Sequence, residues 1–262
     1  MKNVYLIFCI TLTTAMMSLS GCKKSADQEE NISVETAQDM QSEVLGEAAG
    51  RLPEEQKHAL AFGAVLATRN SMNYDTIVGM DQPNKEDFIQ VLKDDWSIVD
   101  RESAIKKLEW LKMEGRHISS DPSYFGYDEI YTSIIQGTAE DFTEEAEAFE
   151  DVYSVLQNEY GYTPEELNSI TTVSAWDYDC LVVVARWSYL CEYITEGEAW
   201  SYIYAASEKG AKDYSSWRTY FAGVLFGRAI WAEEEGFDVD NKAIADHLLL
   251  NSNSIYQSVN FK

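Results

Sequence analysis

Helix-start signals recur along this chain and dominate its pattern. Residues 163–166 (Thr-Pro-Glu-Glu) and 195–198 (Thr-Glu-Gly-Glu) each place a threonine three positions before a glutamate, as in a capping box. The best strand candidate, Val182 to Val184, lies between flanks with helical periodicity, and the chain has only four prolines. The pattern predicts an all-α fold, a single helical bundle-like domain of about eight helices.

Further signals delimit individual helices. Pro53, followed by two glutamates, suits a first helical position, and the apolar run over 59–67 is expected to form one buried helix. Asp100 precedes the apolar stripe of 101–114, and Gly115 follows that stripe as a helix stop. These positions predict one helical segment that starts near Pro53 and a second that covers 101–114 and ends at Gly115.

A long helix is expected near the C-terminal end. Ser215 is placed to cap it, residues 216–235 form its body, and Gly236 closes it. Gly223 and Gly227, four positions apart, would let another segment approach this helix closely. Outside a membrane, this spacing indicates a packing contact and not a dimer motif.

The first residues have the pattern of an export signal. Lys2 supplies a short positive end, 4–18 is apolar apart from small hydroxyls, and Leu19-Ser20-Gly21-Cys22 resembles the lipobox of bacterial lipoproteins. We expect a signal peptide over 1–21 and a diacylated Cys22 as the mature N-terminus, held at roughly 0.8 kcal/mol per buried methylene. An ordinary signal peptide with an incidental cysteine is the alternative.

The anchor would be followed by an acidic, polar tether over 22–50 and the helical domain over 51–262. Lys23 stands where, in the Gram-negative sorting pattern, an aspartate would favour retention in the inner membrane. This resemblance implies a lipid-anchored protein of the cell envelope, in the outer membrane.

Charge limits the partners. Without residues 1–21, the chain has 19 basic and 45 acidic residues, a net charge of −26. Repulsion from phosphates argues against nucleic acid and anionic lipid head groups as ligands, whereas a basic protein partner would be attracted. A solvated acidic surface with no specific partner is the plainer interpretation.

The cysteines and histidines indicate no metal site or cofactor. Cys180 and Cys191 fall in one predicted helix over 178–193, where eleven positions separate their Cα atoms by about 16 Å. A disulfide needs roughly 4.4–6.8 Å, so these thiols are predicted to stay unpaired and buried. The scattered histidines form no zinc pattern, and we expect no cofactor.

Three blocks of the chain together resemble a known bacterial family, the domain of unknown function 1266. The blocks are Trp96–Ala104 continuing to Leu108–Leu111; Ala175–Asp177 with Ala185–Trp187, Tyr193–Ile194 and Glu198–Trp200; and Ser216–Trp217 with Gly227–Arg228 and Trp231. The resemblance covers roughly 55–235. It departs at Cys180, where the family often has arginine, and at Glu192, where it often has glycine. The family implies a fold class but no established activity.

Two acidic residues are catalytic candidates. Glu102 and Asp177 could meet in a cleft as paired carboxylates, one of them protonated by burial, as in a hydrolase. We favour a structural interpretation, in which Asp177 caps its helix and Arg186 neutralises a carboxylate inside the bundle. Arg186 lies seven positions after Asp179, so both would share a helix face.

Three arginines are ligand-binding candidates. Arg101, Arg186 and Arg228 each neighbour acids and tryptophans, and together they could bind a small anion. Internal ion pairs and stacking on aromatic rings are the preferred alternative. His117 lacks a serine or cysteine elbow, so we expect it to face solvent or cap a helix. Seven tryptophans could suggest a carbohydrate-binding platform, but Trp110, Trp187, Trp200 and Trp231 fall in apolar stripes and are expected in the core.

The sequence therefore leaves the molecular function open between three hypotheses. A non-catalytic protein-interaction module on the envelope is favoured by the predicted anchor, the charge and the absence of a catalytic motif. A carboxylate-dependent hydrolase acting on envelope material is the second hypothesis. A binder of a small anionic ligand is the third.

Overall fold

The computed structural model describes residues 52–121, 123–232 and 236–262, and the predicted signal peptide, Cys22 and tether lie outside them. Residues 51–262 form one compact unit. Its helices are α2 (Glu54–Ala61), α3 (Ala64–Arg69), α4 (Lys85–Trp96), α5 (Arg101–Met113), α6 (Tyr127–Gln136), α7 (Thr143–Tyr160), α8 (Pro164–Asn168), α9 (Ala175–Leu190), α10 (Glu196–Asp213), α11 (Trp217–Ala232), α12 (Val239–Ala245), the π-helical η1 (Asp246–Leu250) and α13 (Ile255–Ser258).

The predicted all-α fold is confirmed, since the described residues contain helices and no strand. Eight of these helices have eight or more residues, namely α2, α4, α5, α6, α7, α9, α10 and α11. The others are short segments, which sequence periodicity does not detect. In the described ranges, no helix combines the length and apolarity required to cross a bilayer.

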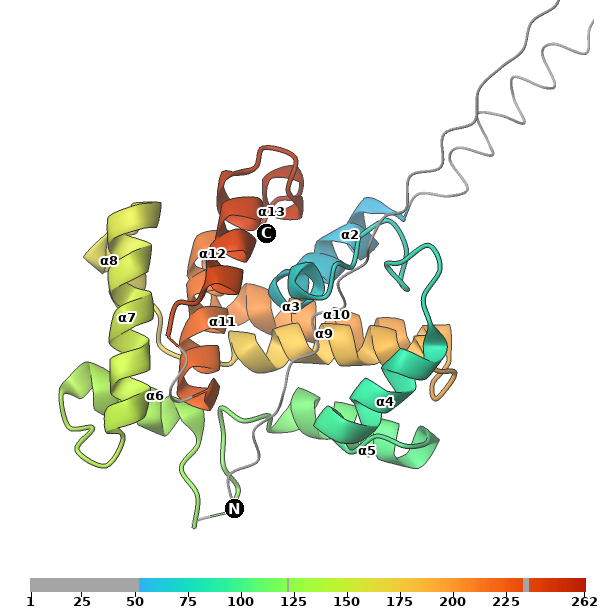
Figure 1. The fold of residues 1–262 in the computed structure, drawn as a ribbon, viewed down its shortest axis with the longest axis horizontal. Helices are drawn as coiled ribbons and strands as arrows, with labels where there is room; N and C mark the ends of the chain where they lie inside the picture. The colour runs from blue at the N-terminus through green and yellow to red at the C-terminus, as the bar shows by residue number, and fades with distance from the viewer. Residues whose placement is uncertain (1–51, 122, 233–235) are drawn as a thin grey trace, which may run out of the picture. The chain divides into compact units, whose positions relative to one another are not determined.

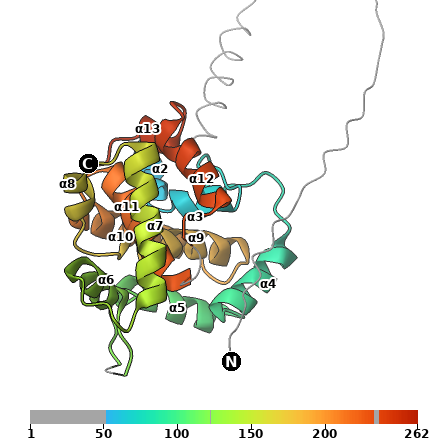
Figure 2. The same ribbon diagram turned by 60° about the vertical axis from the view of Figure 1, so that its left-hand side comes forward.

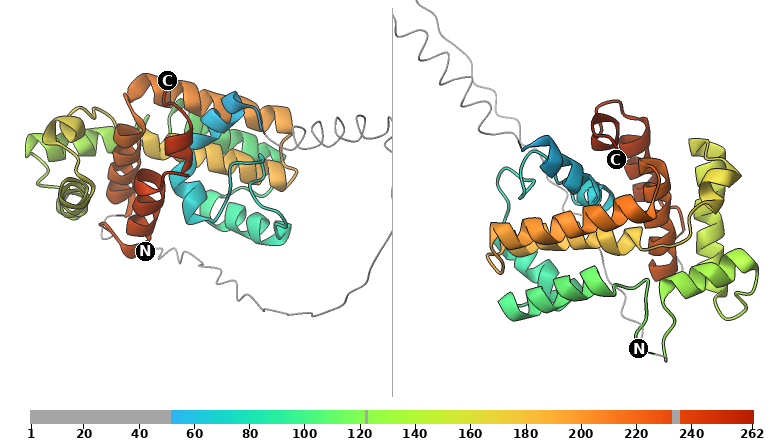
Figure 3. Two further views of the ribbon diagram at one scale, coloured as in Figure 1. Left: turned by 90° about the horizontal axis from the view of Figure 1, so that it is seen from above. Right: turned by 180° about the vertical axis from the view of Figure 1, so that it is seen from behind.

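Helix α9 lies at the centre of the fold, alongside α10 (Figure 1; Figure 3, right). Fourteen of its sixteen residues are buried, so α9 is covered on all sides and not along one stripe. Helices α3, α4, α5, α10 and α11 all pack against it. Side chains of α9 therefore reach several segments that are far apart in the sequence.

Helix α7 packs along α11 and covers it on one side of the molecule (Figure 2). Phe149 of α7 and Phe226 of α11 have ring centroids 4.5 Å apart, and the ring of Tyr131 from α6 lies against both. Aromatic rings bury large areas and prefer tilted contacts of this kind. This cluster attaches α6 and α7 to the rest of the domain.

The prediction of one continuous helix over 59–67 is wrong. Helix α2 ends at Ala61, α3 begins at Ala64, and Gly63 lies between them. A Cβ on Gly63 would lie 2.4 Å from Cγ1 of Val182, so the chain approaches α9 closely here. The break frees backbone N–H groups at the start of α3, which a side chain of α9 then binds.

The predicted helix starts are largely confirmed. Capping boxes form at Asp100 with Ser103, at Thr163 with Glu166, and at Thr195 with Glu198. At two helix starts, the predicted and the observed positions differ by one residue. Pro53 is the N-cap of α2 and not its first helical residue, and the Ser216 hydroxyl, in place of Ser215, accepts from the backbone N–H of Thr219. Assignments of helix ends vary by this amount.

The helix expected over 178–193 is observed over Ala175–Leu190, so Cys191 lies just beyond it, but the two body cysteines, Cys180 and Cys191, are unpaired and buried as predicted. Burial raises the pKa of the Cys191 thiol to about 11 and holds the pKa of the Cys180 thiol well above its usual value. Both are therefore small apolar core groups and not reactive thiolates.

The close approach predicted at Gly223 and Gly227 of α11 is also present. A Cβ at Gly223 would lie 2.5 Å from the ring of Tyr214, and one at Gly227 would lie 2.6 Å from Cβ of Trp176. The two glycines thus admit side chains from neighbouring segments to the surface of α11. They are packing positions.

Candidate functional site

Asp177, in the first turn of α9, connects three helices. Its Oδ2 accepts hydrogen bonds from the backbone N–H groups of Arg116 and His117, at 2.7 and 2.9 Å, and from Nδ1 of His117 at 2.8 Å. The backbone carbonyls of Arg116 and His117 in turn accept from the N–H groups of Tyr127 and Asp128 at the start of α6. One carboxylate therefore holds the segment that joins α5 to α6.

Arg116 supplies a cation beside Asp177. Its Nη1 lies 3.5 Å from Oδ1 of Asp177. The guanidinium also lies over the rings of Trp96 and Trp110, at 5.1 and 5.7 Å from their centroids. Arg116 thus compensates the charge of the buried carboxylate.

His117 is buried, so the expectation that it faces solvent or caps a helix is wrong. The carboxylate of Asp177 fixes one ring nitrogen, and the ring of Tyr178 packs against the imidazole at 5.9 Å. Asp128 lies nearby and accepts from Val173 N–H at 2.7 Å. Burial raises the pKa of the Asp128 carboxyl.

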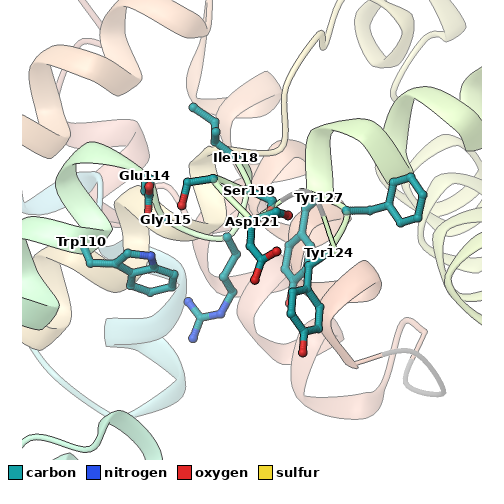
Figure 4. Close-up of a pocket in the computed structure, with 11 residues that line it drawn as sticks. Trp110, Glu114, Gly115, Ile118, Ser119, Asp121, Tyr124 and Tyr127 are labelled. Carbon is teal, nitrogen blue, oxygen red and sulfur yellow. Dashed lines mark hydrogen bonds between the residues drawn. The ribbon is translucent and has the colours of Figure 1, made fainter.

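A depression of about 300 Å³ opens beside this segment. In Figure 4, Trp110 lies on one side of it, Tyr124 and Tyr127 lie on the other, and the Asp121 carboxylate lies between them. The lining is completed by Glu114, Gly115, Arg116, Ile118, Ser119, Ser120 and Phe125. The depression therefore combines aromatic rings with carboxylates.

Large apolar side chains are exposed next to the depression. Tyr124 is 72 % exposed, Phe125 is 62 % exposed and Ile118 is 51 % exposed. Scattered exposed apolar residues are ordinary, but here three come from one short segment. Phe125 touches only the ring of Phe142 among aromatic partners in the described residues, at 5.1 Å.

One stretch of the sequence contains acidic but no basic residues, although Arg218 and Lys242 from outside it pair with Glu166 and Glu159. Between Arg116 and Arg186 the chain has 15 aspartates and glutamates and no lysine or arginine. This stretch includes α6, α7 and α8. The exposed acids of α7, among them Glu144, Glu147 and Glu150, therefore have no basic neighbour within the stretch.

The structure does not bring Glu102 and Asp177 together. Glu102 is exposed in the first turn of α5, whereas Asp177 binds residues that follow the other end of the same helix. Thirteen residues of helix separate these ends by about 20 Å. Asp177 also caps the α5–α6 segment and not its own helix.

The three candidate arginines bind three different segments. Arg101 is exposed and forms a two-bonded ion pair with Glu198, at 2.6 and 2.9 Å. Arg228 is buried and contacts Asp238 at 3.4 Å. Arg186 is fully buried and binds the loop between α3 and α4. No shared anion site is formed by these contacts.

Arg186 binds backbone and not a carboxylate. Its Nε donates to the Ile77 carbonyl at 2.8 Å, and its Nη2 donates to the Asn73 carbonyl at 2.6 Å. Within the described residues, Nη1 has no partner. Burial lowers the pKa of Arg186 to about 10, so the group stays charged at neutral pH.

Asp179 is the side chain that closes the break between α2 and α3. Its carboxylate accepts from the N–H groups of Val65 and Leu66 at 3.0 and 2.8 Å, in the first turn of α3. Burial raises the pKa of Asp179 to about 7, and the two backbone hydrogen bonds act in the opposite direction. Its role is to cap α3 from the core.

The tryptophans form no carbohydrate platform. Trp187 and Trp200 are buried as predicted, and Trp110 is half-buried at the depression. Trp231 is exposed, contrary to the prediction, and its ring lies 5.8 Å from that of Trp176. Its position near the end of α11 leaves one side uncovered by the described residues.

The described residues contain no group of three or more histidines, cysteines, aspartates or glutamates that could hold a metal ion. Asp238 and Asp240 both contact Arg69, at 3.8 and 3.3 Å. Asp238 also caps α12. Their oxygens are thus used by the fold.

Sequence reasoning missed the residues around the depression. Glu114 ends the predicted helix, and Arg116, Asp121 and Tyr124 lie in the loop after it, where no motif singles them out. One signal was present: the sequence lacks any lysine or arginine for 69 residues after Arg116. A charge profile along the chain would have drawn attention to this region.

Comparisons with known proteins identify a family but no activity. The family described as "Protein of unknown function (DUF1266)" matches residues 91–261, a range that starts and ends later than the expected 55–235. The "Uncharacterized protein YbeR" of Escherichia coli (strain K12) is 33% identical over 63 residues, which is 24% of this chain and 27% of YbeR. The match thus covers about a quarter of that relative, and no solved structure matches. The chain belongs to the DUF1266 family, whose molecular function is unknown.

Proposed function

We propose that this protein is a lipid-anchored, non-catalytic interaction protein of the bacterial envelope, and that it binds a basic protein partner. The observation that carries the proposal is the stretch between Arg116 and Arg186, which has 15 acids, no lysine or arginine, and exposed apolar side chains. Acidic surroundings attract a basic partner, and exposed apolar groups provide area to bury on binding.

The most chemically suggestive residues already have structural roles, which supports a non-catalytic function. Asp177 holds the α5–α6 segment, Asp179 caps α3, and Arg186 binds the loop before α4. Catalytic groups must be available to a substrate. These three side chains are buried and engaged with the fold.

Envelope anchoring rests on the lipobox-like Leu19-Ser20-Gly21-Cys22. Two or more acyl chains on one residue hold a protein firmly in a bilayer. Metabolic labelling with palmitate should mark the wild-type protein and not Cys22→Ser, and only the wild type should sediment with membranes. An intact, unmodified leader on protein purified from cytosol would refute the anchor.

The partner is tested by capture from envelope extracts at moderate salt. The double variant Glu147→Lys with Glu150→Lys reverses two exposed charges on α7, and Asp81→Lys with Glu208→Lys reverses two exposed charges outside the acidic stretch. We expect one basic protein to be retained by the wild type and the second variant but lost by the first. Recovery of no protein, with copurification of a small molecule, would overturn the proposal.

A hydrolase is the second candidate, favoured by the hydrogen bond between Asp177 and His117. A carboxylate that orients a histidine can prepare it as a general base, and Nε2 of His117 has no hydrogen-bond partner in the described ranges. Turnover of envelope material that is abolished in a folded Asp177→Asn variant would establish this candidate. Turnover unaffected by both Asp177→Asn and His117→Gln would exclude it.

A further inference from the structure

We infer that the depression beside the α5–α6 segment receives a lysine or arginine side chain of the basic partner. This inference rests on the proposed interaction function and names the site and the chemistry of recognition. The depression of about 300 Å³ is at the lower end of the range for small-molecule pockets. It therefore suits one side chain of a partner better than a large cofactor.

The aromatic lining supplies the first part of the recognition. Tyr124 and Tyr127 lie together on one side of the depression (Figure 4). A cation within about 6 Å of a ring centroid is attracted by the negative face of the ring, by about 0.5–1 kcal/mol at exposed sites. Tyr124 is largely exposed, so a partner can reach its ring.

Two carboxylates supply the second part. Glu114 lines the depression, and its side chain has no hydrogen-bond or ion-pair partner in the part of the chain that the structure describes. Asp121 accepts from the Ser123 N–H at 2.9 Å through Oδ1, and this hydrogen bond lowers the pKa of its carboxyl. Both groups are acceptors for an ammonium or guanidinium group.

The basic residues near the depression do not neutralise its two carboxylates. Arg116 also lines the depression, but its charge is compensated by Asp177 at 3.5 Å. Lys107 lies 4.7 Å from the centroid of Trp110 and is half-buried. Neither Glu114 nor Asp121 forms an ion pair with these two cations in the described residues, and no other lysine or arginine follows Arg116 for 69 residues.

The neighbouring apolar side chains define the rest of the partner segment. Ile118 and Phe125 are exposed next to the depression and offer contacts to an apolar residue near the cation. Such an arrangement, a charged group in a pocket with apolar contacts around it, is common at protein interfaces. The occupant is thus a basic, amphipathic protein segment.

The test uses the full chain and a short, labelled peptide of alternating leucine and lysine pairs. Binding is measured by fluorescence anisotropy at moderate salt for the wild type, Glu114→Gln and Tyr124→Ala. Two controls are Glu208→Gln, which removes an exposed acid from α10, and Ile135→Ala, which removes an exposed apolar side chain from α6. We expect Kd to rise two- to fivefold in each site variant, equivalent to 0.5–1 kcal/mol, and to stay unchanged in the controls.

A second measurement separates insertion into the depression from general charge attraction. Carbon-13 labelled lysine methylenes of the peptide should shift upfield on binding, because they lie over an aromatic ring, and Tyr124→Ala should abolish the shift. Equal weakening by Glu208→Gln, or no upfield shift, would overturn the inference. If the inference fails in this way but the double variant Glu147→Lys with Glu150→Lys still loses the captured partner, the proposed function stands and only this site is wrong. If neither partner nor peptide binds the wild type, both fail.

Discussion

A Cβ atom on Gly115 would lie 2.4 Å from Oδ2 of Asp177. These residues are 62 positions apart, and Gly115 has a left-handed backbone with φ of 66°. The absence of a side chain at Gly115 lets the carboxylate reach the N–H groups of Arg116 and His117. The glycine that ends α5 is therefore also the position at which α9 holds the α5–α6 segment.

Gly115→Ala is expected to be strongly destabilising. The new Cβ would displace the Asp177 carboxylate, and the alanine would be held at an unfavourable positive φ. Each effect costs on the order of 1–3 kcal/mol of stability. Gly161→Ala is a matched control, since its φ is 62° but no atom lies within 4 Å of its Cβ position. Urea unfolding should show a loss of about 1 kcal/mol for the control and a clearly larger loss for Gly115→Ala. Equal losses would contradict the Asp177 contact.

Asp179 should make stability depend on pH. Its pKa is raised from 3.8 to about 7 by burial, so the folded state binds the proton more tightly than the unfolded state. Stability from this group is highest below about pH 4, falls by up to about 1.4 kcal/mol per pH unit as pH rises, and levels off above about pH 7. Asp179→Asn cannot titrate, so the stability difference between wild type and variant should move against the wild type across this window. Urea unfolding of both proteins at several pH values measures this stability difference. A difference that does not change with pH would refute the raised pKa of Asp179.

Arg186→Met should loosen the loop between α3 and α4. The carbonyls of Ile77 and Asn73 would lose a charged donor inside the core, at a cost of about 2–4 kcal/mol. Urea unfolding and proteolysis within 73–79 would measure this. Arg101→Met removes an exposed ion pair and should leave stability nearly unchanged. If both variants unfold at the same urea concentration, the role assigned to Arg186 is wrong.

The two body cysteines should resist alkylation in the folded protein. Cys180 and Cys191 are buried, and burial raises both thiol pKa values, so little thiolate is present at neutral pH. Peptide mass spectrometry after brief iodoacetamide treatment should find both unmodified, and both modified after unfolding in urea. Modification of the folded protein, or a disulfide between them, would show that the end of α9 opens.

Local sequence determined that the body is helical and where several of its helices begin. Asp100, Thr163 and Thr195 bind backbone groups only a few residues away, so their capping boxes can be identified from the sequence alone. The same locality explains the correct prediction for Cys180 and Cys191, because the rise of one helix sets their separation.

Tertiary structure alone decided what the charged residues do. Asp177 and Asp179 bind N–H groups at least 60 and 110 positions away, and Arg186 binds carbonyls more than 100 positions away. Such partners depend on which segments surround α9, and helical periodicity contains no information about them. The aromatic and acidic depression likewise exists only because α5, the following loop and α6 converge on Asp177. A residue's type limits its chemistry, whereas its partner is set by packing between distant segments.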